Sequence, residues 1–130
     1  MYGFTVKVKG DFDQVTRKVV EELAKEGFGV LTEIDVKATL KKKLDLDRRP
    51  YKILGACNPQ LASQALDAEP DIGLLLPCNV VVREDDDGGV VVGFMDPLTV
   101  LGLVQKAELE PLGREVKSRL ERVRDAVAAG

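Results

Sequence analysis

Two cysteine–asparagine pairs are the residues of this sequence best suited to chemistry. They are Cys57-Asn58 and Cys78-Asn79, and the chain contains no other cysteine. A cysteine can act as a nucleophile, a redox group or a soft-metal ligand when its thiol is accessible and ionises. Cys57, Asn58, Cys78 and Asn79 are therefore the candidate thiol or ligand site.

The first pair predicts the start of a helix. Asn58 is a favourable N-cap, and Pro59 suits the first helical position, where its missing N–H costs nothing. Cys57 would then end a strand beside a helix N-terminus, where the partial positive charge lowers the pKa of a thiol or binds a small anion. The alternative is that Cys57 is a small core residue sharing the face of Tyr51 and Ile53.

The second pair predicts a bulge in a long apolar strand over residues 72–84. Pro77 cannot donate to a sheet ladder, so it marks an edge, a bulge or a break, and bulges often re-aim side chains near a site. Asn79 would point to the face opposite Cys78. Cys78 is either a site residue or a core cysteine. The spacing of 21 positions from Cys57 would also let the sulfurs meet as a redox or soft-metal pair.

The composition excludes several classes of function. There is no histidine, which removes imidazole acid–base catalysis, Ser–His and Cys–His nucleophiles, and His-ligated zinc or haem. No phosphate-binding glycine loop is present. A net charge of -3 with two tyrosines, four phenylalanines and no tryptophan gives no basis for nucleic-acid binding. We therefore expect no metal, no cofactor and no nucleic-acid partner.

Three charged clusters are better explained as solvated surface than as sites. The lysines at 41–43 lie largely opposite the apolar stripe of a helix, and the acidic run 85–87 precedes two glycines in a turn without EF-hand spacing. Glu33 and Asp35 share one strand face, but nothing apolar around them would raise a carboxyl pKa.

Hydrophobic periodicity predicts a single α+β domain spanning residues 1–130. Alternating or apolar runs predict strands at 2–10, 29–36, 51–57, 72–84 and 89–95, and amphipathic patterns predict helices at 11–27, 36–44, 59–68, 96–104 and 112–127. The predicted fold is a two-layer sandwich in which a mostly antiparallel sheet of about five strands packs on helices.

The predicted setting is the cytoplasm. No apolar stretch reaches the roughly 18 residues of a membrane helix, and the N-terminus alternates like a strand instead of resembling a signal peptide.

Apolar runs at 74–82 and 90–94 in so small a domain favour a homodimer. The scarcity of Asn, Gln, Cys and Met beside abundant Glu, Arg and Lys indicates a heat-stable protein.

Four segments together resemble the domain-of-unknown-function 302 family of small prokaryotic proteins. They are IDVKATLKKKL, ILGACNPQLASQAL, IGLLLPCNVVVRE and MDP, which follow one another across nearly the whole chain. The resemblance implies a TATA-binding-protein-like arrangement of strand, helix, four strands and helix, and it implies no activity. Its motif positions here are Cys57, Asn58, Pro59, Pro77, Cys78 and Asn79.

Three hypotheses for function follow, in decreasing order of preference. The first is a small cytoplasmic binding module for a partner or for a small anionic or thiol-reactive ligand, with its site near the Asn58 helix start and the Pro77 bulge. The second is a purely structural or partner-binding protein whose cysteines belong to the core. The third is a thiol-dependent redox protein or enzyme that uses Cys57 with Cys78 as the partner thiol.

Overall fold

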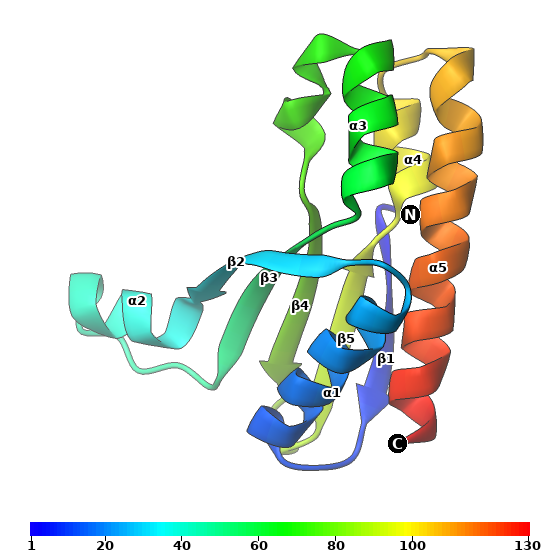
Figure 1. Ribbon diagram of the computed structural model, residues 1–130. Helices are drawn as coiled ribbons and strands as arrows, with labels where there is room; N and C mark the ends of the chain where they lie inside the picture. The colour runs from blue at the N-terminus through cyan, green and yellow to red at the C-terminus, as the bar shows by residue number, and fades with distance from the viewer.

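A five-stranded antiparallel sheet with helices on one side organises the computed structural model, which describes all residues from 1 to 130 (Figure 1). The strands lie in the order β1-β5-β4-β3-β2, and every neighbouring pair is antiparallel. Their bounds are β1 Gly3–Val8, β2 Gly29–Asp35, β3 Tyr51–Cys57, β4 Cys78–Glu84 and β5 Val90–Met95.

Five α-helices and two short 3-10 helices connect and cover the strands. They are α1 Phe12–Lys25, α2 Val36–Leu44, α3 Pro59–Ala68, η1 Pro70–Leu75, α4 Pro97–Gly102, η2 Ala107–Leu109 and α5 Glu110–Ala129. The main elements β1, α1, β2 to β5 and α5 follow the order strand, helix, four strands, helix. The predicted α+β sandwich with a mostly antiparallel sheet is therefore confirmed.

Helices α1 and α5 cover one face of the sheet, which we call the covered face. Leu23 of α1 and Leu120 of α5 are fully buried there, against strand residues such as Leu54, Val80 and Val82 that are also fully buried. Burying each such side chain contributes about 1.5–3 kcal/mol, so this layer is the main source of stability. Helices α3, α4, η1 and η2 form a second, smaller core beyond the end of the sheet.

The long strand predicted over residues 72–84 is wrong in its first half. Residues 70–75 form η1, and β4 begins only at Cys78. Ile72 is 1% exposed because it packs into the second core, so the apolar run has a local reason to leave the sheet. Pro77 lies before the first paired residue, where its missing N–H interrupts no ladder.

Strand β2 and helix α2 project from the edge of the sheet, and we call residues 31–46 the β2–α2 arm. The chain bulges between Val30 and Thr32, and almost every residue of β2 is exposed. Helix α2 has no buried residue and lies away from the body in Figure 1. The predicted amphipathic helix is present, but its apolar stripe packs on no core of this chain.

Candidate functional site

The first cysteine–asparagine pair lies where β3 passes into α3. Asn58 is the N-cap of α3, and its side-chain oxygen accepts a hydrogen bond from the Leu61 N–H at 3.2 Å. Pro59 occupies the first helical position. The predicted helix start is therefore confirmed. Cys57 is half-buried and forms no disulfide.

Asn58 also lies against the turn between α1 and β2. It is 7% exposed, and its amide nitrogen would lie 2.8 Å from a Cβ added to Gly27, which has a φ of 86°. Any larger residue at Gly27 would meet both backbone strain and this amide. Arg119 of α5 donates to the Glu26 carbonyl beside the turn at 3.0 Å. Asn58 thus caps α3 and packs against the turn between α1 and β2, so it acts as a structural residue.

The second pair straddles the start of β4. Cys78 is 8% exposed and belongs to the main core. Burial raises the pKa of the Cys78 thiol to about 11, and the nearby Cys57 sulfur adds to the shift. A thiol with a raised pKa is protonated at neutral pH and is a poor nucleophile. Cys78 therefore fits the core interpretation.

The bulge predicted at Pro77 is wrong. Strand β4 pairs with β3 without interruption from Cys78 opposite Ala56 onward, and the bulge of this sheet lies in β2 instead. Asn79 faces away from Cys78, as predicted, and is exposed opposite Gly55. Its amide needs no protein partner because water can reach it.

The four candidate residues do not form one site. Cys78 faces the covered side, whereas Cys57 follows the inward-facing Ala56 and so faces the other side. Asn58 is buried in a helix cap, whereas the half-buried Cys57 and the exposed Asn79 lie on the sheet face opposite Cys78. The two sulfurs are near enough to influence each other but are directed to opposite faces.

The surface that the structure leaves available is the other face of the sheet, which we call the open face. The pairing places Gly93, Val81, Ile53 and Ile34 in one row across β5, β4, β3 and β2. A second row contains Val91, Arg83 and Tyr51, and a third contains Asn79, Gly55 and Thr32.

The open face is apolar at its centre and polar around it. Val91 is 8% exposed and Ile34 is 49% exposed, with Val81, Ile53 and Tyr51 between these values. A hollow of about 870 Å³ extends from this face around the β1 edge toward α5. Tyr51, Asn79, Val81, Arg83, Val91 and Gly93 of the open face line it.

A sequence signal for this surface exists in the strands themselves. Val80–Val82 and Val90–Val92 are apolar at consecutive positions, so each strand presents valines to both faces. Tyr51, Ile53, Val81 and Val91 belong to no chemical motif, and they were not predicted as surface residues.

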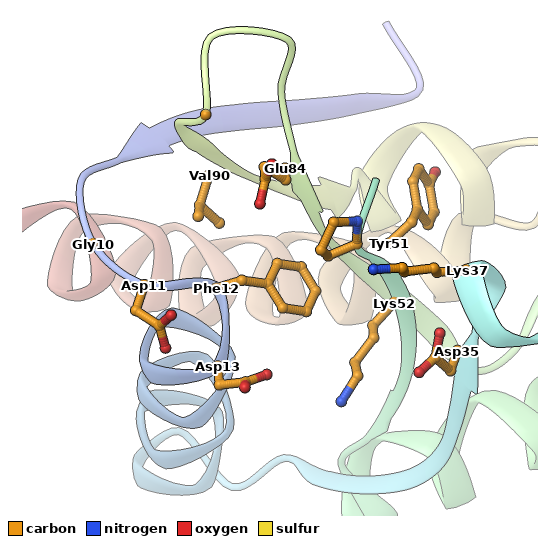
Figure 2. A pocket seen from close by; sticks show the side chains of 12 residues that line it. Gly10, Asp11, Phe12, Asp13, Asp35, Lys37, Tyr51, Lys52, Glu84 and Val90 are labelled. Carbon is orange, nitrogen blue, oxygen red and sulfur yellow. The ribbon is translucent and has the colours of Figure 1, made fainter. Parts of the chain in front are cut away.

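A second, more polar cavity of about 540 Å³ lies at the opposite end of the sheet from α3 (Figure 2). Asp11 and Asp35, which line it, are the N-caps of α1 and α2. Lys52 extends into it and pairs with Glu33 at 2.8 Å. That bond, followed by the charges of Glu33, Asp35 and Asp13, raises the pKa of Lys52. The charged groups here largely satisfy one another or cap helices.

The chain offers no preformed metal centre, because no three side chains of the Cys, Asp, Glu or His type converge on one point. No helix has the length and apolar character needed to cross a bilayer. Asp96, in the MDP segment, caps α4 and pairs with Lys117 at 2.9 Å, so this motif residue also serves the fold.

The fold and the surface together define a small α+β sandwich with one helix-covered and one open sheet face. Residues 4–127 match the family described as domain of unknown function DUF302, and the chain belongs to that family. An uncharacterized protein of Aquifex aeolicus (strain VF5) is 30% identical over 107 residues, which span 72% of this chain and 73% of that protein.

A solved relative has nearly the same fold. The crystal structure of an uncharacterized conserved DUF302 protein from Bacillus stearothermophilus superposes with a TM-score of 0.90 at 31% identity, covering 98% of each chain. These relatives carry no assigned activity, so the function of the present chain is unknown.

Proposed function

We propose that this protein is a binding module for a protein partner and that the open face of its sheet is the binding surface. The observation that carries the proposal is the position of Val81, Ile53 and Val91 at the centre of a sheet face that no helix covers. Clustered apolar side chains with polar neighbours are typical of interaction sites.

The layout of the open face supports a macromolecular partner. Its centre is formed by Val81 and Ile53. Arg83 lies beside them between Val91 and Tyr51, and Thr5 and Asn79 lie at the margin. An apolar centre with a polar rim, and with Tyr and Arg present, matches the anatomy of protein interfaces.

The thiol-dependent alternative receives no support from the geometry. The Cys78 sulfur is buried with its pKa raised to about 11, and it is directed to the face opposite Cys57. A resolving thiol has to be accessible and directed toward its partner.

We also propose a cytoplasmic setting and a heat-stable protein. Two unbonded thiols fit a reducing compartment. Ion pairs that share one member form small networks: Glu22 pairs with Lys18 and Lys25, and Lys41 pairs with Asp45 and Asp47. Such networks matter most at high temperature. A melting temperature above about 80 °C would support this proposal, and one in the mesophilic range of about 45–65 °C would contradict it.

Photo-cross-linking in cells that express the protein tests the binding proposal. A benzophenone amino acid replaces Ile53 at the centre of the open face, and in a matched control it replaces Leu66 of α3, which is 44% exposed. We expect a discrete cross-linked product from position 53 and none from position 66. The absence of any product at position 53, in a variant that folds normally, would contradict the proposal.

A further inference from the structure

The isolated chain exposes more surface than a folded monomer of its size. Its accessible surface is 7649 Å². A typical monomer of 14.2 kDa exposes about 6,800 Å². The excess of about 850 Å² equals the area of about 800 Å² that each partner buries in a standard protein interface.

The β2–α2 arm contributes exposed apolar side chains to this surface. Ten large apolar side chains of the chain are exposed, and four of them lie in the arm: Leu31, Ile34, Leu44 and Leu46. Their exposed fractions range from 44% to 68%. Ile34 continues directly into the central row of the open face, opposite Ile53. The arm and the open face therefore form one continuous apolar surface.

Helix α2 has little of the packing that usually stabilises so short a helix, because Val36 and Leu40 are only partly buried and Leu44 is exposed. It has nine residues, and none of them is buried. Isolated helices shorter than about 12–15 residues are marginal in water, and most helical stability in proteins comes from packing an apolar face. The stripe of Val36, Leu40 and Leu44 would supply such a face if another surface covered it.

We propose that a second copy of this chain covers the open face and that the β2–α2 arm of each protomer packs on its partner in a two-fold symmetric dimer. This inference rests on the proposed function of the open face and names its occupant. The same chain carries an unfilled apolar hollow and an unpacked apolar helix. A two-fold axis lets each protomer supply both parts, so the excess area of the two chains is buried together.

Pairing through the free edge of β2 is the competing geometry. The bulge between Val30 and Thr32 distorts that edge, and Glu33 and Asp35 place carboxylates along it. Bulges and edge charges are the devices that prevent strand addition. Face-to-face packing with the arm is therefore the favoured arrangement.

Sedimentation velocity of the full-length chain between 0.1 and 100 μM tests the inference. We expect the natural protein to sediment at about twice the mass of 14.2 kDa over most of this range. Leu44→Glu, in the arm, and Ile53→Lys, in the open face, should each weaken dimerisation at least 100-fold. Leu74→Glu, at a site that is 87% exposed outside both regions, should leave the dimer unchanged. Circular dichroism checks that each variant is folded.

The outcomes separate this inference from the proposed function. A dimer that survives Leu44→Glu or Ile53→Lys would overturn the inference, and so would a natural protein that is monomeric at 100 μM. If a monomeric chain still cross-links from position 53 to a different protein in cells, the open face remains a binding surface and only the second copy is wrong. A cross-linked product of two copies of this chain supports both.

Discussion

The two faces of the sheet are built from adjacent residues of the same strands, yet they are completed differently. Val80 and Leu54 are fully buried beneath α1 and α5, whereas their neighbours Val81 and Ile53 lie on the face without a helical layer. In a half-solvated antiparallel sheet, the outward positions are normally polar. Valines at both positions indicate that both faces of this sheet have to be packed against another layer, and the chain itself supplies a layer for only one face.

The largest expected effect compares Leu54 with Ile53. Leu54→Ala removes a fully buried side chain and should lower the free energy of unfolding by about 2–5 kcal/mol. Ile53→Ala removes a half-exposed one and should cost less than about 1.5 kcal/mol, provided that unfolding is measured at a concentration where the protein is monomeric. Urea titrations of both variants check this. Equal losses would mean that the open face is packed within the monomer.

The two cysteines extend the comparison to pH. Because burial, and then the charge of Cys57, raises the pKa of Cys78 in the folded state, the unfolded chain loses this proton first as pH rises. The contribution of the protonated Cys78 thiol to the free energy of unfolding is therefore intact below about pH 9. It decreases between pH 9 and 11, by roughly 2–3 kcal/mol in total. Cys78→Ala should reduce this loss and Cys57→Ala should leave most of it. Denaturant titrations at pH 8, 9.5 and 11 measure it, and identical pH profiles for the two variants would contradict the assignment.

Two glycines test the packing of the open face itself. A Cβ on Gly55 would lie 2.2 Å from the Thr32 Oγ1 and 2.9 Å from the Pro77 Cγ, so Gly55→Ala should destabilise by about 1–3 kcal/mol. On Gly93 the closest atom would be 3.4 Å away, so Gly93→Ala should be nearly neutral. Thermal melts of the two variants give the comparison. A neutral Gly55→Ala would show that Thr32 and Pro77 do not crowd this position.

The smallest expected effect separates the two asparagines. Asn58→Ala removes the cap of α3 and should cost about 1 kcal/mol. Asn79→Ala should change stability by less than about 0.5 kcal/mol, because its side chain is exposed on the open face. Chemical denaturation is again the measurement. A larger loss for Asn79→Ala than for Asn58→Ala would reverse the assigned roles.

The local features of the fold could be predicted from the sequence. The N-cap Asn58 was predicted from its own residue type and from the proline that follows it, and the structure confirms it. The order of elements follows from hydrophobic periodicity in the same way. Such features depend on residues within one turn of each other.

The features that were missed depend on long-range contacts. Alternation shows that Tyr51, Ile53 and Cys57 share a face, but only the placement of α1 and α5 decides that this face is the open one. The apolar run 72–76 is typical of a strand, but it leaves the sheet because Ile72 packs into the second core. Cys57, for which a core position was the alternative to a site, is half-buried and outside the main core, whereas Cys78 is a core cysteine.

The central claim is that one sheet face is closed by the chain itself and the other by a second copy. Hydroxyl-radical footprinting between 0.1 and 100 μM tests it, with Tyr51 reporting on the open face and Phe94, which is 2% exposed, reporting on the covered face. We expect oxidation of Tyr51 to increase severalfold on dilution, while oxidation of Phe94 stays low and constant. Oxidation of Tyr51 that does not change with concentration would contradict it.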